Sequence, residues 1–343
     1  MKAAAALQSR LTKPAGALGR LEALSIHLAG ITGKLNPPLG RKAVIVMAGD
    51  HGVTRQGVSA YPQEVTAQMV LNFLDGGAAI NVLARQAGAR VVVVDMGVAG
   101  DLPDHPNLVQ AKVARGTRDF TQAPAMTQSE VQQAIAAGIE VLETEVRRGL
   151  DLVAVGEMGI GNTTAASALT AVFTKAPPEK VTGRGTGVDD EALARKVRVV
   201  QSALDLHHPA PADPIDALAK VGGLEIAGLV GVLLGAAGHR LPVVLDGFIS
   251  SSAALVAAAI SPTAKDYFIA SHRSVEQGHR VMLRHLGLRP LLNLNLRLGE
   301  GTGAVLAFPL IEAAVRTLNE MATFESAGVS TAHDAPGATP NDL

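Results

Sequence analysis

The segment KAVIVMAGDHG, residues 42–52, joins an unbroken run of apolar residues to a polar turn. Continuous rather than alternating apolarity is typical of a parallel strand that is covered on both faces of its sheet. Three further segments have the same form and also lead into acids and glycines: ARVVVVDMGV (89–98), DLVAVGEMGIG (151–161) and LPVVLDGF (241–248). Ligands of open α/β sheets bind at the carboxyl ends of the strands, so these segments predict a polar ligand site at one edge of a sheet.

Helical patterns fill the stretches between these strands. Residues 62–88 predict two helices that are separated at Asp75-Gly76-Gly77, and residues 127–149 begin with the capping-box spacing of Thr127 and Glu130. Two more helical patterns lie at 189–208 and 225–238. The alternation of strands and helices predicts an α/β fold with a doubly wound, mainly parallel sheet.

Composition excludes several classes of function. The chain has 343 residues, a net charge of −1, no Cys, no Trp and two Tyr. A near-neutral net charge gives no broad attraction for nucleic acid or anionic membranes. Because the chain has no Cys, disulfides and thiolate metal sites cannot form. The apolar stretches at 226–237 and 241–260 are interrupted by glycines, Asp246 or serines, so they predict buried elements rather than membrane spans. No export signal is recognisable at the N-terminus, and we expect a cytoplasmic protein without a membrane span or nucleic-acid partner.

The two ends of the chain differ from its middle. Residues 1–35 and 303–325 have mainly helical patterns without a strand, which predicts one small helical domain made from both ends. Residues 36–302 then form the large α/β domain. Residues 327–343 are polar and contain Pro and Gly, so we expect a disordered tail.

Two glycine-rich turns have the character of phosphate sites. GEMGIGNTTAAS (156–167) leads into a helix start, where backbone N–H groups and the helix dipole favour an anion. The alternative is a capped turn without a ligand. In GRGTGVDDEALARK (183–196), Lys196 could reach back from the following helix to a phosphate, or be a solvated surface lysine. Two such turns favour a phosphorylated ligand more than either turn does alone.

Four other segments leave alternatives open. Asp50-His51 could bind a metal, although the histidine spacing favours a structural His51; the polar residues that follow, up to Met69, could line a pocket for a planar heterocycle. Asp246 could bind a ribose hydroxyl or cap the helix after it. SHRSVEQGHR (271–280) could hold a serine–histidine nucleophile but is interpreted as a polar loop that faces a ligand. In RLGEGTGA (297–304), Glu300 is either a solvated loop residue or an acid held close to a ligand by its flanking glycines.

Together these segments resemble the nicotinate-nucleotide–dimethylbenzimidazole phosphoribosyltransferase family. The shared motifs occur in the expected order and cover the chain to about residue 315: LTKPAGALGRLE, AGDHGV, YPQEVTAQM, GEMGIGNTT, GRGTG, VGGLEIAG, SHRS with the following E and GH, and RLGEGTGA. Ala15 and Ala17 stand where the family pattern has Pro and Ser. This departure affects the N-terminal helical segment and not the predicted chemistry.

The resemblance implies an enzyme of the cobalamin nucleotide-loop pathway. It would transfer phosphoribose from nicotinate mononucleotide to 5,6-dimethylbenzimidazole with inversion at C1′, yielding α-ribazole 5′-phosphate and nicotinate. It also implies a homodimer with a Rossmann-like large domain, and neither a metal nor another cofactor is expected.

By motif position the catalytic base is Glu300, which would take the proton that the azole loses on attack. Glu157 would bind or orient substrate. Phosphate contacts are expected from Gly159, Gly161, Asn162, Thr163, Gly185 and Lys196, benzimidazole contacts from Tyr61, Gln68 and Met69, and outer polar contacts from Asp246 and Ser274.

Two other functions remain open from the sequence. One is a Mg²⁺-dependent phosphoribosyltransferase that uses a diphosphate donor, for which Asp189-Asp190 is the only adjacent acidic pair near a glycine turn. The other is a non-catalytic nucleotide-binding module.

Overall fold

The computed structural model describes residues 1–330 and contains two compact units. One unit comprises Met1–Leu39 and the chain from Phe308 onward, and the other comprises Gly40–Ala307. The predicted division into functional domains stays a prediction. Of the predicted tail, Ala327 is the last residue of a helix and residues 331–343 lie outside the described residues.

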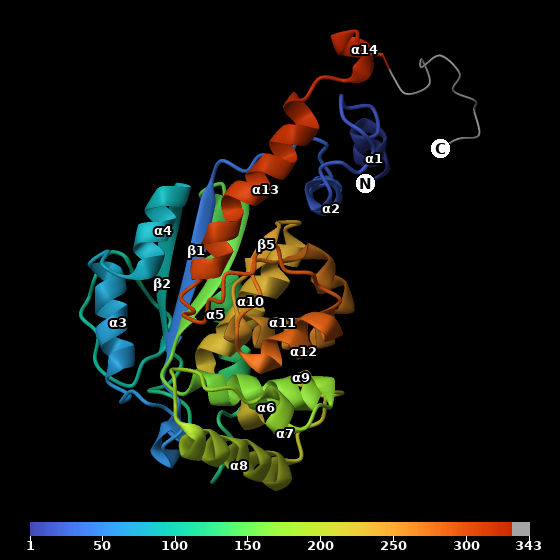
Figure 1. The fold of residues 1–343 in the computed structure, drawn as a ribbon. Helices are drawn as coiled ribbons and strands as arrows, with labels where there is room; N and C mark the ends of the chain where they lie inside the picture. The colour runs from blue at the N-terminus through green and yellow to red at the C-terminus, as the bar shows by residue number, and fades with distance from the viewer. Residues whose placement is uncertain (331–343) are drawn as a thin grey trace. The chain divides into compact units, whose positions relative to one another are not determined.

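The larger unit is built on a six-stranded sheet in which every neighbouring pair is parallel (Figure 1). The strand order is β3-β2-β1-β4-β5-β6. Strands β2 and β3 are added on one side of β1 and strands β4 to β6 on the other, so the strand order reverses between β1 and β4, as in dinucleotide-binding folds. This confirms the predicted Rossmann-like, doubly wound α/β class. The strands are β1 (Lys42–Gly49), β2 (Ala89–Gly97), β3 (Leu108–Gln110), β4 (Leu152–Met158), β5 (Val243–Leu245) and β6 (Phe268–Ala270).

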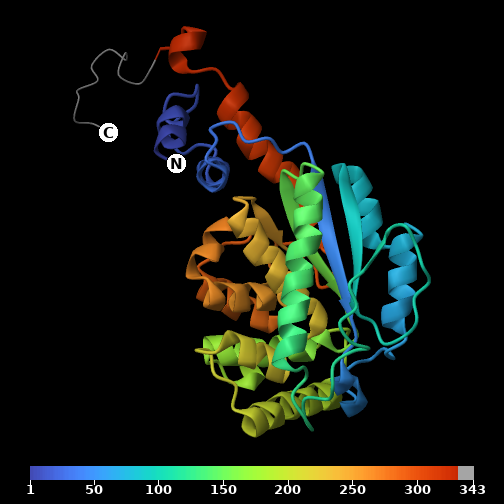
Figure 2. The same ribbon diagram turned by 180° about the vertical axis from the view of Figure 1, so that it is seen from behind.

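The central strand β1 is buried along its whole length, as its continuous apolar sequence predicts. It pairs with β2 on one side and β4 on the other, and Ile45 lies opposite Val92 and Val155. Helix α10 (Leu224–Gly238) contacts β1, β2 and β4 and packs against α5 (Gln128–Arg147). Helices α3 (Val65–Leu74) and α4 (Ala79–Ala87) lie on the opposite side of the sheet from α5 (Figures 1 and 2).

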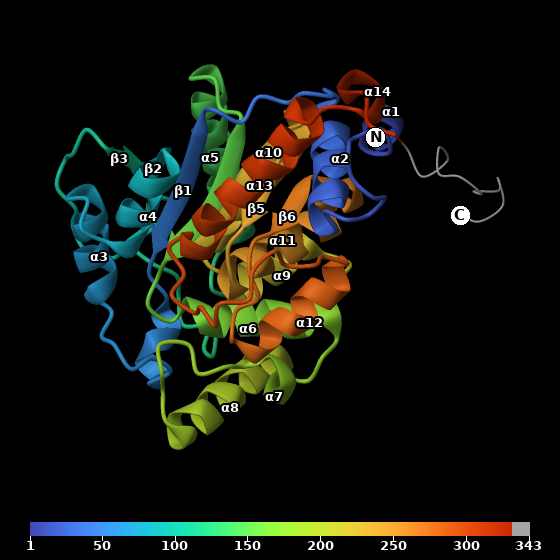
Figure 3. The same ribbon diagram turned by 45° about the horizontal axis from the view of Figure 1, so that its top comes forward.

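The predicted helices form where the sequence signals place them. Helices α3 and α4 are separated at Asp75-Gly76-Gly77, and Thr127 and Glu130 make the reciprocal bonds of a capping box at the start of α5. Helices α6, α11 and α12 contact one another (Figure 3). The remaining elements of this unit are η1 (Gly52–Gln56), α6 (Asn162–Thr174), α7 (Pro178–Val181), α8 (Asp190–His207), α9 (Pro214–Val221), α11 (Phe248–Ile260), η2 (Pro262–Tyr267), α12 (Gln277–Leu286) and the start of α13 (Thr302–Glu320).

The smaller unit is helical. It contains α1 (Lys2–Gln8), α2 (Arg20–Thr32), the C-terminal part of α13 and α14 (Phe324–Ala327). Ala4, Ala29 and Leu318 form its buried cluster, so residues from both chain ends share one small core. Among residues 1–330, no helix combines the length and apolar composition needed to cross a membrane.

Candidate active site

A pocket of about 370 Å³ lies in the larger unit and contains residues that follow the carboxyl end of β4. This end of β4 is beside the β1–β4 reversal, where ligands of doubly wound folds bind. The residues that line the pocket are Tyr61, Val65, Met69, Glu157, Met158, Gly159, Ile160, Asn162, Thr163, Gly185, Thr186, Gly247, Phe248, Ile249, His272, Ser274, Glu276, Arg297, Leu298, Gly299 and Glu300. The structure therefore brings Glu157, Glu300 and most of the other predicted residues into one cavity.

Glu300 is buried in this pocket and has an unusual backbone conformation. Its φ is +62°, its N–H donates to the carbonyl of Glu157 at 3.3 Å, and its side-chain Oε2 accepts a hydrogen bond from the N–H of Ile80 at 3.2 Å. Ile80 is in the first turn of α4, where free N–H groups and the helix dipole favour a carboxylate. Burial raises the pKa of Glu300, and the Ile80 N–H acts in the opposite direction. The Ile80 N–H thus holds Oε2 and orients the carboxylate, and Oε1 remains for a ligand.

The glycines beside Glu300 make room for other protein groups. A Cβ at Gly299 would clash with Oε1 of Glu157, and one at Gly303 would clash with Nδ1 of His272. From the sequence alone, these glycines were expected to allow close approach of a ligand. In the structure their direct effect is to let the loop that carries Glu300 pack against β4 and the His272 segment.

Glu157 is the second acid of the pocket and differs from Glu300 in its environment. Its Oε2 accepts a hydrogen bond from the side-chain amide of Asn162 at the start of α6. Burial, reinforced by the nearby carboxylate of Asp246, raises the pKa of Glu157 to about 8. At pH 7 this group is mainly protonated, so Glu157 is suited to bind or orient a ligand and poorly suited to accept a proton.

We expect Glu157→Gln to flatten the pH dependence of stability. In the unfolded chain Glu157 ionises near its ordinary pKa of 4.5, whereas in the folded protein it keeps its proton to about pH 8. The folded state therefore binds more protons in this window, and the free energy of unfolding falls as pH rises from 5 to 8. Glu157→Gln should remove part of that fall, on the order of 3 kcal/mol, in denaturant titrations at pH 5 and pH 8. If the free energy of unfolding fell equally with pH in both proteins, the raised pKa of Glu157 would be contradicted.

Asp246 does not have the helix-capping role at α11 that one sequence hypothesis gave it, and its contact with a ribose hydroxyl stays a prediction. It does not line the pocket, and it does not cap α11, whose first turn has no side-chain cap. Its carboxylate accepts hydrogen bonds from the N–H groups of Gly301, Gly303 and Ala304, at 3.2, 2.8 and 3.1 Å. Asp246 thus caps the beginning of α13. The sequence around Asp246 could not indicate this contact, because α13 lies far along the chain. Burial raises its pKa to about 7, although these three donors favour the charged form.

Lys196, Thr163 and Gly185 come together beside the pocket. The buried Lys196 extends from α8, and its Nζ donates to Oγ1 of Thr163 at 2.6 Å. Burial lowers the pKa of Lys196 to about 8, while the carboxylate of Glu276 acts in the opposite direction. Gly185 lies close to both, because a Cβ there would be 2.7 Å from the Thr163 hydroxyl and 3.1 Å from Nζ. The solvated-surface interpretation of Lys196 is therefore wrong.

The other predicted residues divide into two groups. Tyr61, Met69 and Ser274 line the pocket with Gly159, Asn162 and Thr163. Gln68 is exposed on α3 and does not line it, and Gly161 precedes α6 as its N-cap with φ +96°. The apolar wall made by Ile160, Phe248 and Ile249 was not predicted, because apolar residues after a strand resemble ordinary core residues.

His51 is a buried structural residue in the described fold. Its Nε2 is 2.8 Å from Oε1 of Glu225, and the side chains of both residues are fully buried. Burial alone would lower the pKa of His51, but the carboxylates of Glu225 and Asp50 together outweigh burial and raise the pKa. Within residues 1–330, no group of three His, Cys, Asp or Glu side chains is arranged to hold a metal ion.

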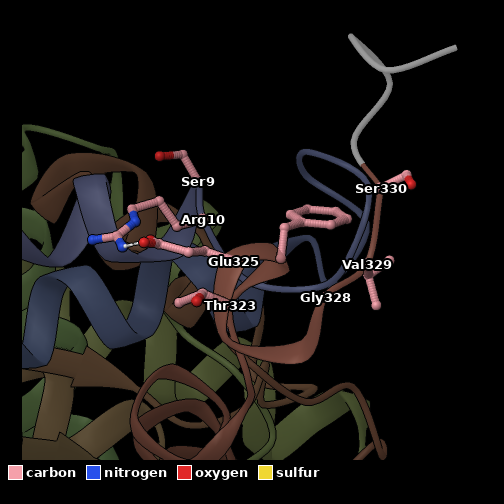
Figure 4. Close-up of a pocket in the computed structure, with 8 residues that line it drawn as sticks. Ser9, Arg10, Thr323, Glu325, Gly328, Val329 and Ser330 are labelled. Carbon is pink, nitrogen blue, oxygen red and sulfur yellow. Dashed lines mark hydrogen bonds and ion pairs between the residues drawn. The ribbon is translucent and has the colours of Figure 1, made fainter.

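A second hollow, of about 590 Å³, lies in the smaller unit and contains none of the predicted site residues. It is lined by residues of the α1–α2 connection and the segment around α14, and Arg10 and Glu325 form an ion pair at 2.8 Å within it (Figure 4). Both side chains are largely exposed. Such a pair contributes little to stability and creates no distinctive chemistry.

The fold and the pocket define a doubly wound α/β enzyme with an oriented acid next to an apolar wall and a lysine–threonine cluster. A family model described as phosphoribosyltransferase matches residues 1–329. The chain belongs to the nicotinate-nucleotide–dimethylbenzimidazole phosphoribosyltransferase family, and its predicted enzyme class, a pentosyltransferase, is confirmed.

The similarity extends over nearly the whole chain. The nicotinate-nucleotide–dimethylbenzimidazole phosphoribosyltransferase of Chloroflexus aurantiacus is 64% identical over 323 residues, which are 94% of this chain and 92% of that protein. The enzyme of Chloroflexus aggregans is 63% identical over 328 residues, 96% and 93% of the two chains. The crystal structure of CobT from Thermus thermophilus matches with a TM-score of 0.93 and 53% identity, covering 96% of this chain and 98% of that one.

Proposed function

We propose that the enzyme transfers the phosphoribosyl group of nicotinate mononucleotide to 5,6-dimethylbenzimidazole in cobalamin nucleotide-loop assembly. The products are α-ribazole 5′-phosphate and nicotinate, and the configuration at C1′ is inverted. Membership in the family supports this reaction, since the relatives carry both substrates in their names.

The reaction requires one proton acceptor and no proton donor. One azole nitrogen attacks C1′ while the bond from C1′ to the pyridinium nitrogen breaks, and its electron pair returns to the nicotinate ring. The ring leaves without needing a proton. The attacking azole becomes cationic and loses the proton on its second nitrogen, which Glu300 accepts. A pair of carboxylates that act as acid and base, as in glycosidases, is unnecessary.

The observation that carries this proposal is the contrast between the two acids. Glu300 is oriented by the Ile80 N–H in the same pocket as Phe248 and Ile249, whose apolar side chains suit a flat, neutral ring. Glu157 has a pKa of about 8 and stays mainly protonated at neutral pH. Its neutral carboxyl can donate a hydrogen bond to a substrate oxygen. Different environments thus give two neighbouring acids different roles.

We assign the 5′-phosphate to the cluster of Lys196, Thr163 and Gly185. The ammonium group and the hydroxyl are 2.6 Å apart, so a phosphate oxygen could bind both. Asn162 and Thr163 begin α6, whose dipole adds to the attraction. Gly159 and Ser274 line the same pocket, while Gly161 supports the turn from outside it.

Lys196→Met should raise the KM for nicotinate mononucleotide about 10- to 100-fold, because a charge-assisted hydrogen bond contributes about 1.5–3 kcal/mol. Methionine keeps most of the buried stem, so the KM for dimethylbenzimidazole should change little. Steady-state kinetics with each substrate varied in turn tests this. A donor KM that stays at the wild-type value would remove Lys196 from the phosphate site.

The proposed function is tested by incubating the protein with nicotinate mononucleotide and dimethylbenzimidazole, without added metal, and separating the products by chromatography. We expect nicotinate and α-ribazole 5′-phosphate in equal amounts. Turnover only with a ribosyl diphosphate donor and Mg²⁺ would support the alternative phosphoribosyltransferase. Binding of nicotinate mononucleotide without nicotinate release would support the non-catalytic module.

Two further properties belong to this proposal. We expect a homodimer, as the family resemblance implies, and a cytoplasmic enzyme. Analytical ultracentrifugation tests the first, and fractionation of the source cells tests the second.

A further inference from the structure

An acidic side chain occupies the part of the pocket that we assign to phosphate. Oε1 of Glu276 accepts a hydrogen bond from the N–H of Gly185 at 3.0 Å. Glu276 is 7% exposed and lines the pocket together with Thr163 and Gly185. A carboxylate therefore binds a backbone donor that an incoming phosphate would be expected to use.

The second oxygen of Glu276 is buried and has no hydrogen-bond partner among the described residues. The carboxylate also lies against Gly183, where an added Cβ would clash with Oε2. A buried carboxylate oxygen without a donor is costly, so something must offset its burial. The nearby Lys196 ammonium offers a favourable charge, consistent with the effect of Glu276 on the pKa of Lys196.

A phosphate at this place would meet a like charge. Glu276 and the phosphate would compete for the Gly185 N–H and for Lys196, and two negative charges a few ångströms apart in a partly buried site repel strongly. The carboxylate must then leave the Gly185 N–H or share a proton with the phosphate. Either change subtracts from the affinity that the Lys196 cluster would otherwise have for phosphate.

We propose that Glu276 is a specificity-determining residue, which occupies the phosphate cradle in the free enzyme and has to be displaced by the donor. This inference rests on the proposed function. Its consequence is that a phosphate group alone binds weakly. Only a ligand whose ribose and pyridinium ring add further contacts displaces the carboxylate, so free inorganic phosphate does not fill the site.

The test compares wild type with Glu276→Gln, which keeps an oxygen for the Gly185 N–H and removes the charge. The dissociation constant of inorganic phosphate is measured by calorimetry, and the KM values for nicotinate mononucleotide and dimethylbenzimidazole by steady-state kinetics. We expect Glu276→Gln to bind phosphate at least about tenfold more tightly and to lower the KM of the phosphorylated donor, with the KM of the uncharged azole unchanged. A merely structural role of Glu276 would not selectively change the dissociation constant of phosphate and the KM for nicotinate mononucleotide.

Two further variants complete the experiment. Glu191→Gln makes the same chemical change on an exposed side chain of α8 and should leave all three constants at wild-type values. Glu276→Asp keeps the charge and should keep weak phosphate binding. Unchanged or weaker phosphate binding by Glu276→Gln overturns the inference, even if wild type releases nicotinate as proposed. If wild type releases no nicotinate, the proposed function fails, while tighter phosphate binding by the variant still supports the displaced carboxylate.

Discussion

Glu300→Gln is expected to fold and to bind both substrates but to lose about 10²- to 10⁴-fold in kcat, the usual contribution of a general base. Glutamine can accept the hydrogen bond from the Ile80 N–H that orients Glu300, so the loop should keep its conformation. It cannot take the azole proton. Loss of kcat with little change in the two KM values would show that an interaction specific to the transition state had been removed.

The control for this variant is Glu140→Gln on the exposed face of α5, which should have wild-type kinetics. The pH profile gives a second readout. Because burial raises the pKa of Glu300, wild-type kcat should fall with decreasing pH at a higher pH than the ordinary value for glutamate. The residual rate of Glu300→Gln should lack that step. A wild-type kcat in the variant would remove Glu300 from the mechanism.

Gly156→Ala should lower kcat about 10²-fold although residue 156 bears no functional group. Gly156 lies in β4, and an added Cβ would clash with the carbonyl oxygen of Glu300 and lie 2.6 Å from the nitrogen of Gly301. These are backbone atoms, so the methyl group cannot be accommodated by a rotamer change. The loop that carries Glu300 must move, and a shift near 1 Å in a catalytic group can cost about that factor. Overpacking should also reduce stability by about 1–3 kcal/mol.

Gly238→Ala is the matched control, since Gly238 ends α10 and a Cβ there has no neighbour within 4 Å. It should have wild-type activity and equal or greater stability. Assays well below the melting temperature separate the positional effect from unfolding. If Gly156→Ala were destabilised but turned over normally, the close packing of β4 against Glu300 would not matter for catalysis.

The long elements could be predicted because their sequence signals are local. The apolar run that forms β1, the Asp75-Gly76-Gly77 break and the capping box at Thr127 each specify their structure within a few residues. Strands β3 and β6 were missed. Each has three residues and is defined by its pairing with a neighbouring strand, β2 for β3 and β5 for β6. Local periodicity does not show such pairing.

The site was harder to predict than the fold. Glu157, Thr163 and Glu300 are in motifs whose glycines mark a special backbone, and the structure brings all three together. The role of Asp246 depends on Gly301 to Ala304, more than 50 positions further along the chain. Contacts of this kind depend on topology, as does the bond between Glu276 and Gly185.

The central claim is that Glu300 receives the azole proton, and a crystal structure with bound dimethylbenzimidazole tests it most directly. The quantity to measure is the distance from the Glu300 carboxylate to the nearer azole nitrogen. We predict about 2.6–3.2 Å, with the other nitrogen directed toward the C1′ position of the donor. An azole that binds beyond hydrogen-bonding reach of Glu300, with the carboxylate turned to solvent, would contradict the mechanism.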